Sequence, residues 1–454
     1  MSLLFHQFTW FEWVSELSIG WIIIIACFLY LFFQKYIYFI IALCAHVLNI
    51  FHSLPAVPNH MFFEWLVNLT LLVTIFYFLI KAKSYNINSI EDKLWARFMP
   101  AGKIALFILY FYVVFHKLNS DFFNPEVSCG GIFFEDVIRN FGLHHITFMH
   151  DILLVDNLGL RTTSIYLTII AEAVIPILLI FRKTRNAGIL TGVLFHLVLP
   201  FQGHTGIYSF SAMLFTFYVF FWGEDTFVKF NTFLSKYNKP ITLYFIGSFI
   251  ALIFIKKFAG WFLFNTSSTL FWFIYSVVYI VLFYSSTRNK IFSFPQQLIT
   301  NYNIGLLWMS PIIIFINGLS PYLGLKTEFS YSMFSNLRTE GGITNHYLVP
   351  VTTQVFDYQK QIVTILETNN NDIKKADKYH QKDVHFVLFE FIRLLNKNKN
   401  DFYVKFSVGG KNYIVKKTNG VYEEDGGLDM TQNYWLQKFF RFRNVYDGPS
   451  LCQH

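Results

Sequence analysis

The sequence predicts an α-helical polytopic membrane bundle of about nine to ten transmembrane helices, followed by a small α+β extracytoplasmic domain. The first observation is the composition: of 454 residues, 54% are hydrophobic and 14% are charged, and the mean hydropathy is +0.42. Because soluble domains carry about 25% charged residues, this composition excludes a soluble enzyme, a disordered regulator and a collagen-like fibre.

The second observation is the uneven distribution of charge along the chain. Residues 1–319 hold 33 of the 64 Asp, Glu, Lys and Arg residues, and residues 320–454 hold the other 31. The first part has the low charge density of a membrane bundle, and the second part has that of a water-soluble domain. We therefore expect a transmembrane domain over 1–319 and a soluble extracytoplasmic domain over 320–454.

The third observation is a series of long apolar runs, since a helix needs roughly 20 apolar residues to cross the hydrocarbon core. Pro200, Gly203 and Gly206 interrupt one of these runs, which leaves two short helices or one broken helix open there. Counting two helices, the predicted spans are 17–33, 36–54, 61–80, 101–116, 163–181, 186–201, 207–222, 239–255, 261–284 and 303–319.

Basic residues between these runs predict the orientation. With the N-terminus outside, the inner loops hold 14 basic residues and the outer loops before the tail hold five. This split favours ten spans in the inner membrane of a cell, with both termini extracytoplasmic. The start, MSLLFHQFTWFEW, has no basic region, so no cleavable signal peptide is expected. No Lys/Arg-rich block contains interleaved aromatics, so the net charge of +8 does not indicate nucleic-acid binding.

Outside the spans, the sequence predicts three local structures. GIFFEDVIRNFGLHHITFMHDILLV, within 117–162, has apolar residues at helical spacing with acids between them, which predicts one or two amphipathic helices on the outer surface. In the tail, DVHFVLFEFIRLLN predicts a helix. DFYVKFSVGGKNYIVKKTNG alternates around a Gly-Gly pair and predicts a β-hairpin.

The four cysteines form neither a disulfide scaffold nor a metal-binding pattern, and no metal site is predicted. Cys27 and Cys44 lie inside apolar runs and are expected to be packing residues. Cys129 and Cys452 lie in polar segments, and a bridge between them is left open.

Lys117 is the most informative ionisable residue, because it ends the fourth predicted span, after His116 and before Asn119 and Asp121. Burial would lower the pKa of a lysine and make its neutral amine available as a base. The alternative is an interfacial lysine that reaches lipid head groups. Spacing alone does not decide between the two.

Two further groups of polar residues lie inside or beside spans. His60 opens the third predicted span, and Glu64 lies one turn further on the same helical face. His46, Asn49 and His52 on the second span either share an outer cavity with them or only join helices.

Glu172 lies near the middle of the fifth span, where a carboxylate costs a few kcal/mol unless it is paired or protonated. A hydrogen bond between helices and a functional role are both open for it. His196 and His204 flank Pro200, and a broken helix at membrane depth is tolerated only where it is buried in protein or lines a cavity.

Four segments, in this order along the chain, resemble one family. HKLNSDFF, after a long apolar helix, resembles the KKLDADW stretch of the vitamin K-dependent γ-glutamyl carboxylases and the wider set of bacterial HTTM proteins (horizontally transferred transmembrane domain). The resemblance covers about residues 1–350. The other similar segments, in the order third-region helix, broken helix and start of the tail, are NHMFFEWLVNLTLL, FHLVLPFQGHTGIYSFSAML and SPYLGLKTEFSYSMFSNLRTEGGITNH.

The resemblance implies a quinol-dependent epoxidase or a carboxylase-like enzyme, with a reduced quinone, O₂ and CO₂ as the expected cofactors. In the carboxylases the second lysine of KKLDADW deprotonates vitamin K hydroquinone, and Lys117 occupies that position. His60 corresponds to the assisting histidine of the family, and His196 is a third candidate catalytic residue. The candidate substrate-binding residues are Glu64, His116, Asn119, Asp121, Glu172 and His204.

The chain also departs from the family. His116 replaces the first lysine, Asn119 replaces an acid, and the tail is too short for a propeptide-binding domain, so carboxylation of a propeptide-tagged protein is not expected. Two other functions stay open. One is a non-catalytic membrane module that handles lipid, or a partner protein through its tail; the other is a different membrane transferase in which His60, Glu172 or His196 supplies the base. The sequence names neither the substrate nor the partner of the tail.

Overall fold

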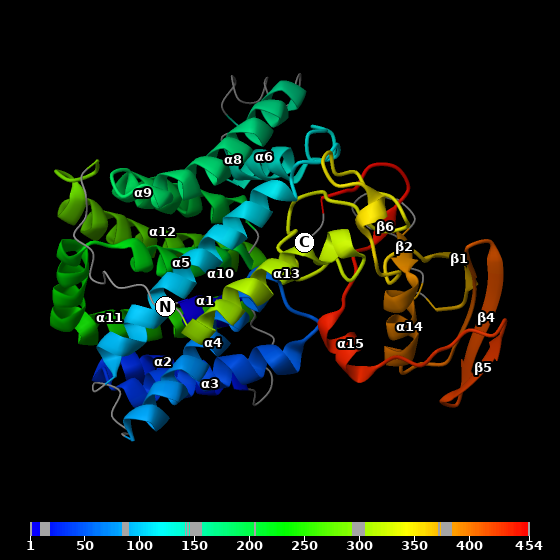
Figure 1. Cartoon of the computed structure of the whole chain (residues 1–454), viewed down its shortest axis with the longest axis horizontal. Helices are drawn as coiled ribbons and strands as arrows, with labels where there is room; N and C mark the ends of the chain where they lie inside the picture. Colours follow the sequence, from blue (N-terminus) through cyan, green and yellow to red (C-terminus); the bar gives the residue numbers. More distant parts are fainter. Residues whose placement is uncertain are drawn as a thin grey trace.

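The computed structural model describes residues 2–9, 19–83, 90–140, 142, 145, 157–203, 206–292, 305–370, 373 and 384–452. Over these residues the chain is mostly helical, and a small antiparallel sheet lies near its C-terminal end. Figure 1 shows the helices gathered in one bundle and the sheet set to one side of it. The coarse fold predicted from composition, a helical part followed by a small α+β part, is therefore confirmed.

Among the described residues, six helices are long and apolar enough to cross a membrane. The four other predicted spans are also helical but shorter, between 13 and 15 residues. At about 1.5 Å per residue, such helices rise about 20 Å. The six long helices are α3 (Tyr36–Ser53), α4 (Asn59–Ala82), α5 (Glu91–Phe115), α8 (Asn157–Ile180), α11 (Glu224–Phe258) and α12 (Gly260–Thr287), and the shorter ones are α2 (Ile19–Phe33), α9 (Arg185–Val198), α10 (Gly206–Tyr218) and α13 (Met309–Leu323).

The interrupted run at 186–222 forms two short helices. After α9 the chain enters a 3₁₀ turn over Leu199–Gln202 with Pro200 at its start, and α10 begins at Gly206. Gly203 has φ +95°, and a Cβ there would lie 2.8 Å from the side-chain nitrogen of Asn140. The positive φ favours glycine at this position, and a side chain there would also displace the end of the Asn140 side chain.

A kink divides α11 into a polar first half and an apolar second half. Tyr237 has non-helical dihedral angles (φ −117°, ψ 18°), and Pro240 follows within one turn. A proline inside a helix removes one backbone hydrogen bond and clashes with the preceding turn. The apolar half after the kink corresponds to the predicted span at 239–255.

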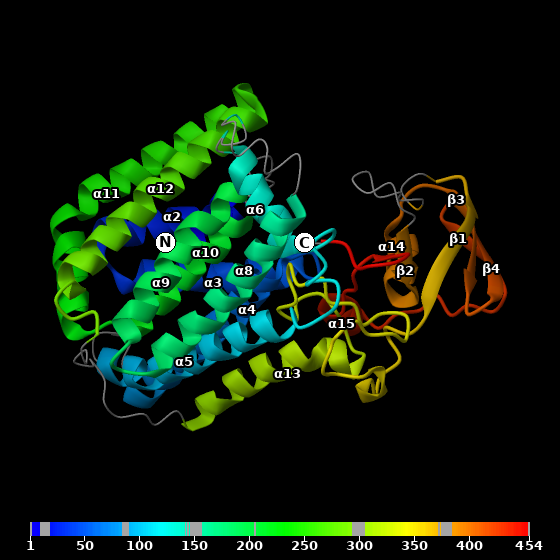
Figure 2. The same cartoon turned by 90° about the horizontal axis from the view of Figure 1, so that it is seen from above.

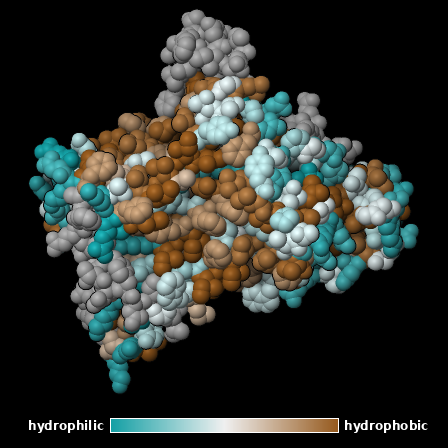
Figure 3. Space-filling model, turned by 45° about the horizontal axis from the view of Figure 1, so that its top comes forward, coloured by the Kyte–Doolittle hydropathy of each residue, from teal (hydrophilic) through white to brown (hydrophobic). Residues whose placement is uncertain are grey.

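The bundle has apolar side chains on its outside as well as in its core. Large apolar residues are strongly exposed on the helices, among them Leu48, Ile80, Phe258 and Phe262, with exposed fractions of 60 to 79%. Figure 3 shows apolar residues over much of the bundle on one face, and more hydrophilic residues at its edges and over the tail. A helix that is apolar all round is typical of a lipid-facing bundle.

The first helix, α1 (Ser2–Thr9), was not predicted. Leu4, Phe5 and His6 are almost completely buried, and the helix contacts α2 and α10 inside the bundle. Phe5 packs edge-on against Trp272 of α12, with ring centroids 5.4 Å apart. The start of the sequence therefore contributes to the core.

The tail contains a six-stranded antiparallel sheet in the order β5-β4-β3-β1-β2-β6. The predicted hairpin is confirmed: β3 and β4 pair with Val408 opposite Lys411 across Gly409 and Gly410, which both have positive φ. The predicted helix DVHFVLFEFIRLLN instead begins as a strand, and only its second part is helical, as α14 (Leu388–Lys397). The strands are β1 (Ile362–Thr368), β2 (Val384–Val387), β3 (Phe402–Val408), β4 (Lys411–Thr418), β5 (Val421–Asp425) and β6 (Val445–Tyr446).

The tail is attached to one end of the bundle. Figure 2 shows α13 running beside α5 toward the tail, and α13 continues to Leu323, past the predicted boundary at 319. Cys129 and Cys452 form a disulfide between α6 (Cys129–Asn140) and the end of the tail, which answers the question left open by the sequence. Lys438 of α15 (Tyr434–Phe439) donates to carbonyl groups at the end of α3.

Helix α6 is one of the amphipathic helices predicted within 117–162; much of the rest of that segment lies outside the described residues. Its Glu135 accepts hydrogen bonds from Arg139 and Arg161. Burial alone would raise the pKa of Glu135, but these two arginines outweigh it and hold the pKa below its usual value.

Candidate functional site

A cavity of about 430 Å³ lies at the end of the bundle that faces the tail. Its wall is mostly apolar and comes from α4, α5, α6, α8, α9 and α10, together with residues 331–334 at the start of the tail. This volume is within the usual range for a small-molecule site. The apolar side chains of the wall include Leu109, Val113, Phe122, Phe133, Phe134, Leu167, Phe195, Ile207, Phe210, Met333 and Phe334.

Lys117 and Glu172 form a buried ion pair in this wall. The Nζ atom of Lys117 lies 2.6 Å from Oε1 of Glu172 and also contacts Oε2. The exposed fractions are 4% for Lys117 and 8% for Glu172. Lys117 is therefore not an interfacial lysine that reaches for head groups, and Glu172 is not an unpaired carboxylate.

The local sequence explains how the two side chains meet. Helix α5 ends at Phe115, and Lys117 lies in the turn that follows, which Asn119 holds by donating to the carbonyl of His116 and accepting from the amide of Phe122. The Phe122 ring centroid lies 5.6 Å from Nζ of Lys117. Glu172 projects from α8, which packs against α5, so a residue near the middle of one helix reaches a residue just beyond the end of the other.

His60 lines the same cavity from the first turn of α4. Its Nε2 lies 2.7 Å from Oγ of Ser209, and that hydroxyl donates to the carbonyl of Gly206. With the hydroxyl proton directed at Gly206, the hydrogen-bond network assigns the ring proton of His60 to Nε2. Nδ1 of His60 has no hydrogen-bond partner among the described residues.

His196 lies behind the cavity wall. Its Nε2 contacts the hydroxyl of Tyr110, which is hydrogen-bonded to that of Tyr218, and its ring packs edge-on against Phe210 of the wall. The sequence predicted His60, His196 and Lys117 as catalytic residues. The structure brings Lys117 and His60 to one cavity and separates His196 from it by a ring.

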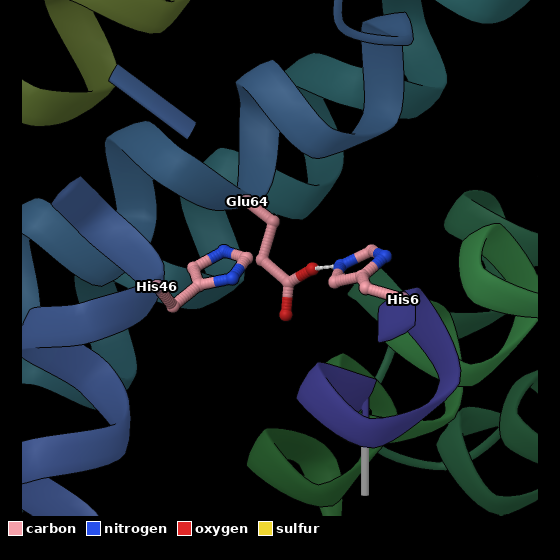
Figure 4. A group of neighbouring side chains, drawn as sticks. All are labelled: His6, His46 and Glu64. Atoms are coloured by element: carbon pink, nitrogen blue, oxygen red, sulfur yellow. Dashed lines mark hydrogen bonds and ion pairs between the residues drawn. The ribbon is translucent and has the colours of Figure 1, made fainter. Parts of the chain in front are cut away.

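Glu64 does not line this cavity. Although it lies one turn from His60 on α4, its carboxylate accepts from Ser2 of α1 at 2.9 Å and pairs with His6. His46 lies beside this pair, and the three residues form a separate buried group (Figure 4). His204 lies outside the described residues.

His116, Asn119 and Asp121 also lie outside the cavity wall, where their polar atoms join the bundle to the tail. The ring of His116 bonds to the hydroxyl of Tyr322 at 2.7 Å and to the carbonyl of Ser330 at 2.9 Å. Asp121 accepts from the side chain of Asn345 and the amide of Ser450. Their hydrogen-bonding capacity is used in attaching the tail.

A second buried lysine, Lys326, lies where the tail meets the bundle, away from the cavity wall. Its Nζ lies 4.7 Å from the Phe62 ring centroid and 5.4 Å from that of Phe329, and it forms no ion pair among the described residues. Its exposed fraction is 5%. Burial lowers the pKa of Lys326 to about 7, because desolvation disfavours the charged amine.

Tail residues 329–336 complete the cavity wall in a strained conformation. Phe329, Tyr331, Phe334 and Asn336 all have positive φ although none is glycine. Each such residue costs of order 1 kcal/mol, and burial of the aromatic rings offsets this cost. The amide of Tyr331 donates to the side chain of Asn59 at the start of α4, which fixes the segment against the cavity.

Comparisons with known proteins found no matching family model, no similar curated protein and no similar solved structure. The sequence reasoning named Lys117, Glu172 and His60 but missed Ser209 and Tyr331, which have no spacing signal that connects them to the cavity.

Proposed function

We propose that this chain is a multi-pass membrane enzyme, related to the HTTM proteins and vitamin K-dependent carboxylases, that removes a proton from a lipid-soluble substrate with an acidic hydroxyl, such as a reduced quinone. The observation that carries this proposal is the buried Lys117–Glu172 pair in the wall of an apolar cavity. A structural ion pair alone would not need a cavity beside it, and buried ionisable groups in the wall of an apolar cavity are typical of functional sites.

In the proposed step, Glu172 takes the proton. While the pair is intact, the ammonium of Lys117 has no lone pair to offer, so the carboxylate is the base. The O–H bond of the substrate breaks, Glu172 becomes a carboxylic acid, and the substrate oxyanion replaces the carboxylate as the partner of Lys117. The base role expected of Lys117 thus becomes that of an electrostatic stabiliser within the pair.

The apolar wall supports this step in two ways. It excludes water, so the attraction between the ammonium and the oxyanion is stronger than in solution. It also suits an aromatic, lipid-soluble molecule. A reduced quinone, when bound, would supply reducing equivalents for a reaction with O₂; His60, on the same wall, is the candidate that assists by positioning the substrate.

The contacts of the tail support the proposed topology of ten crossings. The amide of Ser120 donates to the carbonyl of Asn345, so the end of α5 and the tail lie on one side. Among the described residues between them, three helices are long enough to cross a membrane, α8, α11 and α12, and three crossings would leave the tail on the opposite side. If the shorter helices α9, α10 and α13 also cross, the total is six crossings, which returns the tail to the side of α5 where Ser120 bonds to Asn345. The Cys129–Cys452 disulfide supports an oxidising, extracytoplasmic location for that side.

The test is binding and deprotonation of a short-chain naphthoquinol by the full-length protein in detergent, under argon at neutral pH. We expect the absorption of the quinol anion to appear on binding to the wild type, and to fall at least tenfold in Lys117→Met and in Glu172→Gln. The matched control is Lys326→Met, which removes a buried lysine outside the cavity wall and should leave the signal unchanged.

Three results would contradict the proposal: no anion with the wild type, an unchanged signal in Lys117→Met, or equal loss in all three variants. A tightly bound acyl lipid in the cavity, retained in Lys117→Met, would instead support a non-catalytic lipid-handling module. Elution as a single species on gel filtration checks that each variant is folded.

A further inference from the structure

Three buried side chains with metal-ligating atoms meet inside the bundle, from three different helices. They are His6 of α1, His46 of α3 and Glu64 of α4 (Figure 4). One ligand atom from each lies within 4.8 Å of the other two. The exposed fractions are 0% for both histidines and 6% for Glu64.

The hydrogen bonds of this group are incomplete. Glu64 accepts from Ser2 and pairs with Nε2 of His6. Neither ring nitrogen of His46 has a hydrogen-bond partner among the described residues, nor has Nδ1 of His6. Leaving a buried polar nitrogen without a partner costs about 1–3 kcal/mol, and His46 has two of them. The protein contacts therefore do not account for a histidine at this position.

A shared cation would account for it. Neutral imidazole nitrogens and a carboxylate oxygen are the donor set of catalytic zinc sites and of non-haem iron sites, whereas Ca²⁺ and Mg²⁺ prefer oxygen ligands alone. Ligand atoms about 2.1 Å from one tetrahedral ion lie about 3.4 Å apart. In the structure these atoms lie within 4.8 Å of one another, so side-chain rotations that bring them about 1 Å closer would close the site.

The surroundings leave room for further ligands. A second cavity, of about 250 Å³ and mostly apolar, has Ser2, Glu64 and Asn68 among its lining residues, and the side-chain nitrogen of Asn68 has no partner among the described residues. A water molecule in this cavity could complete the coordination of the ion. The hydroxyl of Ser2 already orients the carboxylate of Glu64, as outer-shell groups do in metal sites.

We propose that His6, His46 and Glu64 bind one divalent transition-metal ion, Zn²⁺ or Fe²⁺, inside the bundle. The proposal does not depend on the quinol chemistry of the first cavity. It does place the ion near that cavity, because the ring of His60, which lines the cavity wall, stacks on the ring of His6 with centroids 5.7 Å apart.

The test measures metal per chain in the full-length protein purified without chelators, by mass spectrometry of the elements. We expect about one equivalent of zinc or iron in the wild type, and at least tenfold less in His46→Ala and in Glu64→Gln. Two controls should keep the metal: His52→Ala, an exposed histidine on the same helix, and His196→Ala, a buried histidine outside the group.

A second measurement decides the matter even if a variant does not fold. After chelator treatment, the wild-type protein is titrated with Co²⁺, and we expect visible d–d absorption bands that saturate at one equivalent. The proposal is overturned if the wild type holds less than a tenth of an equivalent of any transition metal and gives no such bands. Metal content in folded His46→Ala equal to that of the wild type would overturn it as well.

Discussion

Two regions of the molecule each bury a lysine, and the two lysines have different partners. In the cavity, Lys117 is paired with Glu172. At the junction between bundle and tail, Lys326 is equally buried but rests on two aromatic rings, without a carboxylate among the described residues. The ring faces attract an ammonium by only about 0.5–2 kcal/mol, less than burial of the charge costs.

The comparison shows that burial of a lysine is not by itself evidence of a functional role. Burial alone places a lysine where its charge is costly, and the pKa of Lys326 accordingly falls to about 7. At Lys117, by contrast, the amine and the carboxylate of Glu172 lie side by side in the wall of an apolar cavity. This pairing beside a cavity is what distinguishes a candidate acid–base site from a buried lysine in packing.

The largest effect is expected from separating the members of the pair. Glu172→Leu leaves the ammonium of Lys117 buried without a partner, which should lower the free energy of unfolding by about 3–5 kcal/mol. The double variant Lys117→Met/Glu172→Leu should return close to the wild-type value, because no buried charge remains. Thermal unfolding in detergent measures both. A double variant as unstable as the single one would show that the pair is not the cause.

The junction can be weakened without touching either lysine. Cys452→Ser removes the bridge to α6 and should cost about 2–4 kcal/mol in unfolding of the tail. Limited proteolysis of the tail, compared with the wild type under non-reducing conditions, measures the loss. Cys44→Ser is the matched control, since Cys44 is a free cysteine. Equal protection of the two variants would contradict the prediction.

The packing of α13 against α5 links the two regions and is sensitive to one added methyl group. A Cβ on Gly318 would lie 2.2 Å from the ring of Tyr112, so Gly318→Ala should destabilise the bundle by about 1–3 kcal/mol. Gly247→Ala, in α11, meets nothing within 4 Å and should be neutral or stabilising by up to about 1 kcal/mol. The melting temperature should fall in Gly318→Ala and should stay unchanged or rise in Gly247→Ala.

A pH dependence of stability is expected at the junction. Because the pKa of Lys326 is lowered in the folded state, the unfolded chain binds more protons above pH 7, and stability should rise with pH. Each pKa unit corresponds to 1.36 kcal/mol, so the free energy of unfolding should rise by about 2 kcal/mol between pH 7 and pH 9. Lys326→Met should remove this slope, as measured by unfolding at several pH values. The same slope in the variant would assign it to another group.

Much of the fold could be predicted from the sequence, because apolar runs and turn residues act locally. All ten predicted spans are helical over the residues that the structure describes, Pro200 and Gly203 mark the break between α9 and α10, and the Gly-Gly pair marks the hairpin. Helix α1 escaped prediction because eight residues are too few for a membrane span, and its burial depends on α2 and α10.

The candidate site was predicted only in part. Lys117 and Glu172 each stood out as costly charges, yet 55 residues separate them and no periodicity connects them. His60 and Glu64 shared a helical face, but packing turned Glu64 toward His6, a residue in a short segment with no recognisable pattern. The disulfide closes over 323 residues, a pairing that cysteine spacing does not encode.

The loop that carries Tyr331, Met333 and Phe334 has a practical consequence for anyone who shortens this protein. These residues follow the last helix of the bundle, yet their side chains form part of the chamber that holds Lys117. Cutting the chain directly after Leu323 would thus open the chamber to its surroundings as well as removing the sheet. A truncation after Asn336 would keep these wall residues but would still remove the hydrogen bonds of Ser332 with Arg443 and of Asn336 with Ser450 that hold the segment in place.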